Sequence, residues 1–287
     1  MNKSAGWTMS AVAAGVFSST AWAGIYSGPT DTANAIDGAI PSGSGSFVEW
    51  ADAIDASRTA FAPRGSTTID ETGGFNSLGD LDETEIANGD SPGFLTVTFP
   101  TGIRNGSGAD FAVFESGFVF GTTPEGGDGL FAEFAFVEVS SNGTDFARFA
   151  SISTNTAALP GGFGSAFSGF DVTSVFNLAG KHASGFGTPF DLDDLLGDPA
   201  VVAGDVDVDD IQFVRLVDIP GNGSFVDSLG NPILDNWLTT GTGGFDFRLP
   251  VGQGVGVINA VPEPAAAIVL VAANLLSTTR RRVRSRT

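Results

Sequence analysis

The sequence predicts an all-β protein, an antiparallel β-sandwich, and three observations carry this prediction. Glycine accounts for 40 of 287 residues and charged residues for only 16% of the chain, a composition typical of apolar strands joined by tight turns. Short apolar segments alternate with Gly, Pro and Asn clusters, and helical periodicity is scarce. Twenty-five phenylalanines against one tyrosine would fill the interior between two sheets.

The first 23 residues have the three-part layout of a secretory signal peptide. Lys3 precedes a mostly apolar stretch from Trp7 to Phe17, and small residues lead to Ala21, Trp22 and Ala23. This A-x-A pattern predicts cleavage before Gly24. Because the apolar stretch is too short to cross a bilayer, we expect a removed signal helix that engages the secretion translocon. A membrane anchor or a helix of the fold is the alternative.

Residues 24–260 form one predicted domain, because no repeat, charge block or long linker interrupts them. Residues 24–45 are too rich in Gly, Pro and Ser for a regular element. One short helical turn is expected at Phe190–Leu196, closed by Gly197. Strands are predicted at Phe94–Phe99, Asp110–Phe114, Phe131–Val139, Asp145–Ala150, Ile211–Ile219 and Gly254–Ile258.

The clearest local signal is Asn142-Gly143, which lies between two strand-like halves of the segment Val137–Phe146. Asn-Gly readily takes the positive φ angles of a type I′ turn, so a β-hairpin is predicted here. The segment resembles a hairpin of discoidin-like and other galactose-binding-like jelly rolls, and Phe213–Val217 is similar to a late strand of that fold. The resemblance implies a jelly-roll sandwich and leaves the ligand open.

A wider similarity supports a surface protein. It covers GADFAVFESGF from Gly108, FAEFAFVEVSSNGTDFARF from Phe131, FVRLVDIPGNG from Phe213, DSLGNPILD from Asp227 and GFD from Gly244. Together these segments resemble a group of uncharacterised bacterial cell-surface proteins. No activity is implied by this resemblance.

Residues 261–287 have a three-part order of their own. Val261, Pro262, Glu263 and Pro264 precede an apolar segment from Ala265 to Leu276, and the chain ends in a basic cluster formed by Arg280, Arg281, Arg282, Arg284 and Arg286. This order resembles the PEP-CTERM sorting tail of exported bacterial proteins. The resemblance implies recognition by a membrane-embedded exosortase, removal of the tail near Pro-Glu-Pro, and an exopolysaccharide-producing setting.

Physical chemistry agrees with a sorting tail. The prolines cannot continue a helix backwards, so they mark an extended, accessible stretch outside the membrane. The apolar segment is short for a single membrane helix, although residues 277–279 lengthen it, and the arginines would hold its far end in the cytoplasm. We therefore expect transient inner-membrane anchoring before processing, with a lasting C-terminal anchor as the alternative.

Charge and residue content exclude several classes of function. Between Gly24 and Pro262 the chain has 32 acidic and 7 basic residues, a net charge of −25, which repels nucleic acid. The absence of cysteine excludes disulfides, thiol nucleophiles and Cys-ligated metals. A single histidine, His182, excludes a multi-histidine metal site.

Catalytic residues are few, and we expect no enzyme. His182 accompanies no G-x-S-x-G serine, so it is expected to be a loop histidine or a hydrogen-bonded partner, and Lys181 beside it to be solvated. Paired carboxylates among Glu115, Glu133 and Glu138 would suit a glycoside hydrolase. After removal of the signal peptide, however, the chain keeps one Tyr and two Trp to stack on sugars.

Calcium suits the acidic loops better, because this ion takes oxygen ligands. Asp205, Asp207 and Asp209 begin like an EF-hand loop, but Asp210 and Leu216 occupy positions where that loop needs Gly and Glu. The stronger candidate ligands lie in or beside later Gly-rich turns, with one upstream glutamate: Asp218, Asp227, Asp235, Asp246 and Glu115.

Two alternatives for these carboxylates stay open. Turn aspartates commonly cap backbone amides without binding an ion. Glu115 and Glu133 either join the calcium site or line the adjacent sheet face, where Arg148 or Arg215 would serve as a structural partner.

The leading hypothesis is an exported, non-enzymatic cell-surface or extracellular-matrix protein that binds polysaccharide and holds structural calcium. The alternatives are a purely structural envelope protein and a polysaccharide-acting hydrolase. A deep groove flanked by two carboxylates would favour the hydrolase, whereas clustered aspartates at a loop end favour binding.

Overall fold

The computed structural model describes residues 24–123, 126–154, 168–239, 243–249 and 252–262. The predicted signal helix, the predicted C-terminal membrane helix and most of the predicted sorting tail lie outside these residues. None of the described helices is long and apolar enough for a membrane span.

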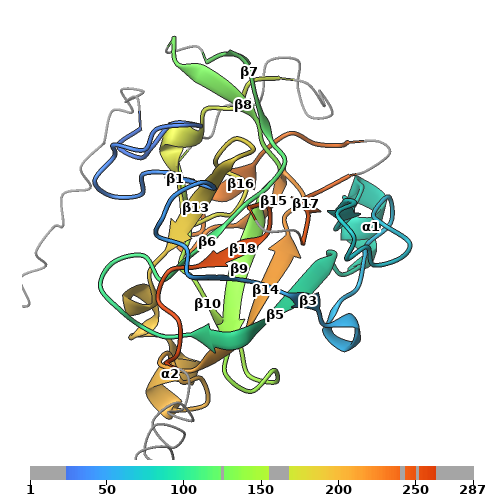
Figure 1. Ribbon diagram of the computed structural model, residues 1–287. Coiled ribbons are helices and arrows are strands. Elements are labelled where there is room, and N and C mark those ends of the chain that lie inside the picture. Colours follow the sequence, from blue (N-terminus) through green and yellow to red (C-terminus); the bar gives the residue numbers. More distant parts are fainter. Residues whose placement is uncertain (1–23, 124–125, 155–167, 240–242, 250–251, 263–287) are drawn as a thin grey trace, which may run out of the picture.

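Two five-stranded antiparallel sheets form the body of the domain (Figure 1). The first has the order β1 (Ile40–Pro41), β13 (Phe186–Phe190), β6 (Phe111–Val113), β18 (Val255–Val257) and β2 (Glu49–Trp50). The second has the order β10 (Ala147–Arg148), β9 (Ala135–Ser140), β14 (Ile211–Asp218), β5 (Phe94–Ile103) and β3 (Ala53–Ile54). The predicted all-β, antiparallel architecture is confirmed at this level.

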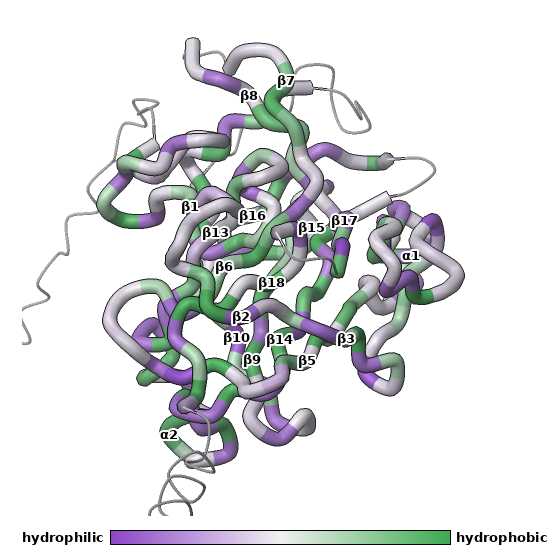
Figure 2. The backbone as a smooth tube through the Cα atoms, viewed as in Figure 1, coloured by the Kyte–Doolittle hydropathy of each residue, from purple (hydrophilic) through white to green (hydrophobic). Residues whose placement is uncertain are grey.

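Apolar side chains from both sheets meet in one core. Phe111 and Val257 of the first sheet and Val97, Val139 and Leu216 of the second belong to the same buried cluster. Burial alternates along much of β14, as expected for a strand with one face on the core. The hydropathy colouring shows these central strands as largely hydrophobic, with more polar loops around them (Figure 2).

Phenylalanine supplies much of this core, as its abundance predicts. The ring of Phe111 stacks on that of Phe190 with centroids 5.3 Å apart, and Phe149 packs edge-on against both. Such aromatic pairs add about 0.5–1.5 kcal/mol beyond their buried area. Through these three rings, the first sheet packs against the segment that follows β10.

Four two-stranded sheets surround the main pair. They pair β7 (Phe118–Thr122) with β8 (Asp128–Phe131), β11 (Ile152–Ser153) with β12 (Val175–Phe176), β15 (Asn222–Val226) with β16 (Pro232–Leu234), and β17 (Asp246–Phe247) with β4 (Asn76–Ser77). The β7–β8 hairpin projects from one end of the molecule (Figure 1).

Helices are short and peripheral. α1 (Glu83–Asn88) begins with a capping box in which Asp82 and Glu85 exchange hydrogen bonds, and α2 (Pro199–Ala203) begins at Asp198 with proline in its first turn. The single-turn 3₁₀ helices are η1 (Ala56–Arg58), η2 (Val172–Ser174) and η3 (Leu192–Leu195). The helical turn predicted at Phe190–Leu196 is therefore present as η3, in the tighter 3₁₀ form.

The predicted strands are found, with different bounds. β5 extends beyond Phe99 to Ile103, and the segment predicted as one strand at Phe131–Val139 is divided between β8 and β9. Residues 132–134 leave the sheet because Asp235 and Asn236 bind the backbone N–H groups of Phe134 and Ala132. This interruption places Glu133 in the interior.

The hairpin at Asn142-Gly143 is confirmed, but the predicted type I′ turn is wrong. β9 and β10 pair through Val139 and Ala147, so the connection is longer than two residues. Gly143 alone of the two central residues has a positive φ, 73°. The side chain of Asn142 instead accepts from the N–H groups of Thr144 and Asp145, and this local bond selects a wider turn.

Candidate functional site: a buried carboxylate cluster

Three carboxylates meet where the sheets and the small hairpins join. One oxygen each of Glu115, Glu133 and Asp246 lies within 4.8 Å of the others. Glu115 and Glu133 are only 5% and 4% exposed, and Asp246 is partly buried. Like charges at this distance repel, so the cluster needs cations or protons to be stable.

The backbone on both sides of Glu133 is fixed by neighbouring side chains. The N–H of Ala132 donates to Oδ1 of Asn236, and that of Phe134 donates to Oδ2 of Asp235, both at 2.8 Å. The hydroxyl of Thr239 lies 2.6 Å from Oε1 of Glu133. The side chain of Glu133 is therefore held in place before any ligand binds.

Glu115 and Asp246 are held in the same way. Glu115 follows β6 and accepts from the N–H of Gly117, while Asp246 lies in β17 opposite Ser77, whose hydroxyl donates to its Oδ1. The backbone of Asp246 also lies near enough to Glu115 to oppose the rise in its pKa. The two carboxylates thus connect the end of β6 to β17.

Three further buried carboxylates adjoin this trio: Asp80, Asp218 and Asp235. The N–H of Thr239 donates to Oδ2 of Asp80 at 2.9 Å, and the hydroxyl of Thr239 lies 2.8 Å from the same oxygen. The same hydroxyl also lies beside Glu133, so it links Asp80 to the trio. Because it has one hydrogen, it can donate to Asp80 or to Glu133 but not to both carboxylates at once.

Asp218, the last residue of β14, has one oxygen without a partner. Its Oδ1 accepts from the N–H of Phe245 at 2.8 Å, whereas its fully buried Oδ2 has no hydrogen bond among the described residues. A Cβ on Gly244, where φ is +73°, would lie 2.4 Å from Oδ1. Glycine at position 244 therefore admits this carboxylate into the interior.

Burial favours the neutral form of all six groups. Burial, followed by the charge of Asp246, raises the pKa of Glu115 to about 8, and burial raises that of Asp246 to about 6. The pKa of Glu133 is raised well above its ordinary value by burial and the charge of Glu115. Burial likewise raises the pKa of the remaining carboxyls, Asp80, Asp218 and Asp235.

Basic residues compensate little of this charge. No lysine or arginine within the described ranges forms an ion pair with any of the six carboxylates. Arg64 donates to the backbone carbonyl of Asp80 but reaches its carboxylate only through longer-range attraction, as Arg248 does that of Asp246, and Arg64 is itself paired with Glu85. The cluster is thus preformed, oxygen-rich and strongly negative when ionised.

The structure gathers four of the five predicted calcium ligands: Glu115, Asp218, Asp235 and Asp246. Glu133, considered as a further member, lies among them. Asp80 was missed because the Gly-rich stretch around it carries no motif. Its only sequence signal is an aspartate in a turn, which is common.

The fifth predicted ligand, Asp227, lies elsewhere. It sits in the β15–β16 turn and accepts from the N–H groups of Ser153, Leu229 and Asn231. Although burial opposes ionisation, these donors lower the pKa of Asp227. Asp227 therefore has the geometry of the turn-forming alternative and does not join the three converging carboxylates.

Other acidic candidates also have structural roles. Asp207 accepts from the N–H of Asp209 in an exposed turn, and neither residue joins the cluster. Glu138 of β9 forms ion pairs with Arg148 and Arg215 at 2.6 and 2.5 Å. The two arginines thus neutralise Glu138, and do not pair with Glu115 or Glu133.

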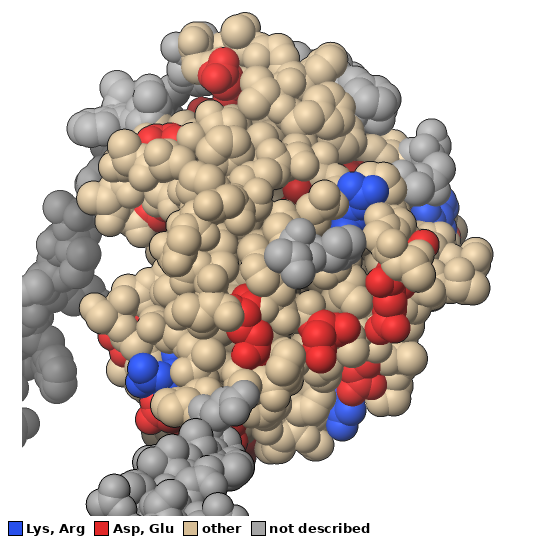
Figure 3. Space-filling model, in the orientation of Figure 1, with Lys and Arg blue, Asp and Glu red and all other residues tan. Residues whose placement is uncertain are grey.

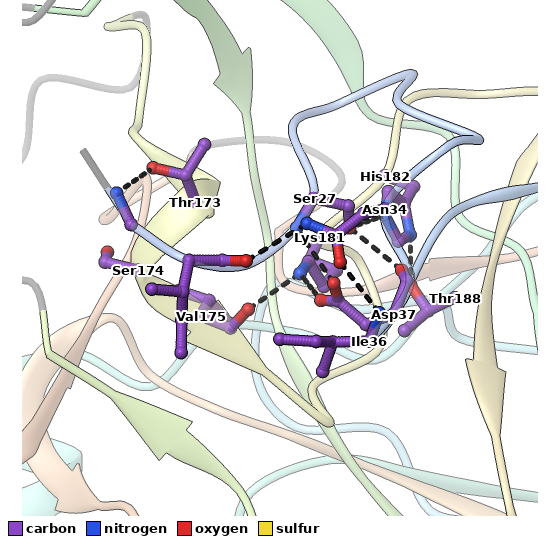
Figure 4. Close-up of polar contacts among 12 residues, drawn as sticks. Ser27, Asn34, Ile36, Asp37, Thr173, Ser174, Val175, Lys181, His182 and Thr188 are labelled. Atoms are coloured by element: carbon purple, nitrogen blue, oxygen red, sulfur yellow. Dashed lines mark hydrogen bonds and ion pairs between the residues drawn. The ribbon is translucent and has the colours of Figure 1, made fainter.

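Lys181 is fully buried, so the prediction that it is solvated is wrong. Its ammonium donates to the carboxylate of Asp37 and, at 2.7 Å, to the carbonyl of Val175 (Figure 4). The Gly- and Ser-rich segment around Asp37 packs over this position and excludes water. An apparently irregular segment thereby supplies a buried counter-charge.

His182 is a hydrogen-bonded partner, which is one of the two alternatives that the sequence predicts. Its Nε2 lies 2.8 Å from Oγ of Ser27 and its Nδ1 3.1 Å from Oγ1 of Thr188 (Figure 4). Burial and the charge of Lys181 hold the pKa of His182 well below its usual range, so the ring is neutral. The Ser27 hydroxyl in turn donates to the carbonyl of Asp37.

A separate surface feature lies at the projecting hairpin. Phe118, Val119 and Phe120 of β7 are 42%, 44% and 39% exposed. The tip of the same hairpin helps to line a cavity of about 430 Å³ together with Thr30, Asp31 and Asp171. Acidic side chains are dispersed over the face of the molecule visible in Figure 3, with basic ones at few points.

Fold and site together define an antiparallel, β-sandwich-like protein with an interior carboxylate cluster. No protein family, curated protein or solved structure gives a significant match to this chain.

Proposed function

We propose that this chain is an exported, exosortase-sorted cell-surface or matrix protein without enzymatic activity, whose sandwich holds calcium and binds polysaccharide. The observation that carries the calcium assignment is the convergence of Glu115, Glu133 and Asp246 within 4.8 Å in a buried setting. Signal-like and sorting-like ends support export. We also propose that the two sheets, in which most neighbouring strands are not consecutive in the chain, form a galactose-binding-like jelly roll.

Calcium fits the donor set of the cluster. It takes six to eight oxygen ligands, and three carboxylates supply up to six when each binds through both oxygens. Magnesium demands a stricter octahedron and keeps its water, while zinc favours the nitrogen and sulfur ligands that this chain lacks here. The divalent charge would also replace the protons that burial otherwise forces onto Glu115 and Glu133.

The same burial argues against a polysaccharide hydrolase. A general acid and a nucleophile must both reach the glycosidic bond, yet Glu115 and Glu133 are 5% and 4% exposed. An ion can reach such a site through small local motions, whereas a sugar chain needs an open groove. A raised pKa at Glu115 is here a consequence of burial beside like charges.

The projecting hairpin supports a polysaccharide-binding role. Exposed phenylalanine rings can stack on the apolar faces of sugars. The aspartate carboxylates of the adjoining cavity can accept hydrogen bonds from sugar hydroxyl groups, and its threonine hydroxyls can accept or donate them. This surface is separate from the carboxylate cluster. In the proposal, calcium stabilises the domain and the hairpin end contacts the ligand.

Thermal unfolding of the full-length chain in millimolar calcium and in excess chelator tests the calcium assignment. An ion bound only to the folded state adds about 2.7 kcal/mol of stability at 100 times its dissociation constant, which corresponds to several degrees. Glu133→Gln should abolish this shift, while Asp227→Asn, outside the cluster, should keep it. An unchanged melting temperature of the unmodified chain in calcium would refute the assignment.

Export and sorting require a separate test in an exosortase-containing host. Replacing Pro262, Glu263 and Pro264 by alanine should leave an unprocessed, membrane-associated chain, whereas the unmodified chain should be shortened and leave the inner membrane. Equal processing of both chains would contradict the sorting proposal and leave the calcium site unaffected.

A further inference from the structure

Gly24, the residue before which cleavage of the signal peptide is predicted, is bound to a distant segment of the chain. Its backbone N–H donates to Oγ1 of Thr173 at 2.9 Å, and the N–H of Tyr26 donates to the carbonyl of Thr173 at 3.2 Å. Thr173 belongs to η2 and lies 149 residues from Gly24. The predicted first residue of the processed chain is therefore a fixed part of the fold.

Only glycine fits at position 24. A Cβ there would lie 1.5 Å from the carbonyl oxygen of Thr173 and 2.6 Å from the backbone nitrogen of Ser174. Glycine allows such a close approach of two backbones. At Gly28, in the same segment, a Cβ would meet nothing within 4 Å. Packing therefore requires glycine directly after the A-x-A pattern, and this observation is independent of that pattern.

A carboxylate lies next to this contact. The hydroxyl of Thr173 gives its one hydrogen to Oδ1 of Asp171 at 2.6 Å, so it accepts from Gly24. Asp171 is partly buried and forms no ion pair with a lysine or arginine of the described ranges. The nitrogen of Gly24 is thus one hydroxyl group away from a carboxylate without a basic partner there.

The surroundings of Thr173 are acidic. Asp171 and Thr173 line a cavity of about 430 Å³ together with Asp31 and Asp128, and no described residue of its lining is basic. Carboxylates that are not neutralised favour a positive charge nearby. A cationic group beside Thr173 is therefore stabilised in a way that a neutral amide is not.

Hydrolysis of the Ala23–Gly24 bond changes the charge of this nitrogen. In the unprocessed chain the nitrogen is an uncharged amide with one hydrogen. When a signal peptidase adds water across the bond, Ala23 becomes a carboxylate, and the nitrogen of Gly24 becomes an amine that takes a proton near neutral pH. The resulting ammonium group has three hydrogens, and one of these suffices for the bond to Thr173.

We propose that Gly24 is the amino terminus of the mature protein and that its α-ammonium binds at Thr173 and Asp171. The inference rests on the proposed export and gives the processing step a further role, because removal of the signal peptide creates the charge that this site accepts. The mature chain is therefore more stable than a chain that continues upstream of Gly24.

The bound terminus fastens a segment that covers the buried ion pair of Lys181 and Asp37. The ring centroid of Tyr26 lies 5.5 Å from the ammonium of Lys181, and the N–H of Ser27 donates to Oδ1 of Asp37 at 2.8 Å (Figure 4). Because both residues follow Gly24 within three positions, binding of the terminus holds the cover of this ion pair in place.

Thermal unfolding of two chains tests the binding of the terminus. One begins at Gly24, and the other keeps Ala21, Trp22 and Ala23, which moves the ammonium roughly 10 Å along the chain, about one Debye length. Both extend to Thr287 and contain every described residue. We expect the chain that begins at Gly24 to melt about 2–4 °C higher. Equal melting temperatures would overturn the proposal.

Asp171→Asn isolates the contribution of charge. Asparagine keeps an oxygen that accepts from the N–H of Thr173 and removes the negative charge. In this background the two chains should melt at the same temperature, whereas with the exposed control Asp209→Asn the difference should persist. An undiminished difference in Asp171→Asn would overturn the assignment of Asp171 as the partner of the ammonium.

The first residue of the exported protein is a separate measurement. Amino-terminal sequencing of the full-length chain after secretion from a bacterial host should give Gly24. A different first residue would overturn the assignment of the terminus, and an unprocessed, unsecreted chain would also overturn the proposed export. The melting comparison uses chains of fixed length, so failure of the binding site and failure of export are told apart.

Discussion

Glu115 follows β6 and Glu133 lies between β8 and β9, yet their carboxylates meet within 4.8 Å in an interior where neither forms an ion pair with a described basic residue. Folding therefore brings together two charges that the unfolded chain keeps apart in water. The electrostatic cost of bringing these two carboxylates together must be offset by a bound cation or by protonation.

Without divalent cations, the stability of the protein should fall as pH rises from about 5 to about 8. The folded-state pKa of Glu115 is raised to about 8 and that of Asp246 to about 6. A raised pKa means that stability is fully present below the unfolded value and is lost as pH rises through the folded value. For Glu115 alone the loss is on the order of 5 kcal/mol.

Urea denaturation in chelator at pH 5, 6, 7 and 8 measures how the free energy of unfolding changes with pH. In millimolar calcium this free energy should change much less over the same series. Glu115→Gln should reduce the slope in chelator, whereas the exposed control Asp209→Asn should not. A flat series in chelator for the unmodified chain would contradict the raised pKa values.

The buried pair of Lys181 and Asp37 yields a second prediction. Lys181→Met removes the partner of Asp37 and leaves an uncompensated charge beneath the N-terminal segment, which typically costs 3–5 kcal/mol. The double variant Lys181→Met/Asp37→Asn should regain much of this loss, because the remaining charge is gone. Equilibrium urea unfolding of the single and double variants measures the difference, and an equal or greater loss in the double variant would argue against the pair.

The two arginines on Glu138 should contribute unequally. Arg215 is 27% exposed and lies 3.7 Å from the ring centroid of Phe146, while Arg148 is 47% exposed, and its contact with the ring of Phe136 is longer, at 4.4 Å. Exposed ion pairs contribute about 0–1 kcal/mol, and desolvated cation–π contacts add up to about 2. Arg215→Met should therefore destabilise the domain by about 2 kcal/mol and Arg148→Met by less than about 1. Equal losses in chemical denaturation would refute this ranking.

The fold class was predictable because strand length, turn chemistry and phenylalanine content act locally. β14 extends over Ile211–Asp218, one residue short of its predicted end, because its β-branched and aromatic residues favour an extended backbone. α1 was missed because its N-cap, Asp82, is followed by only six helical residues, too few for a periodic pattern.

The candidate site was predictable only in its residue types. Acidic residues in Gly-rich turns indicated Asp218, Asp235 and Asp246, but nothing local distinguishes these from Asp227, which caps a turn. The distinction depends on which turns the sheets bring together. Lys181 shows the same limit, because its burial depends on Asp37, 144 residues away in the chain.

The turn at Gly143 provides the last prediction. Gly143 has φ of +73°, and a Cβ there would lie 2.9 Å from the guanidinium group of Arg58. That guanidinium donates to the carbonyl of Gly143 and to Asp55, and it covers the ring of Phe213. Gly143→Ala should therefore combine backbone strain of about 1–2 kcal/mol with displacement of Arg58.

Gly108 is a matched control, because its φ is +72° and a Cβ there would meet nothing within 4 Å. Gly108→Ala should lower the stability only through backbone strain, so Gly143→Ala should be the more destabilising of the two. In an Arg58→Ala background the difference between the two glycine variants should vanish, since the displaced side chain is absent. Chemical denaturation of the four variants measures these differences, and a difference that persists without Arg58 would show that another contact at the hairpin is responsible.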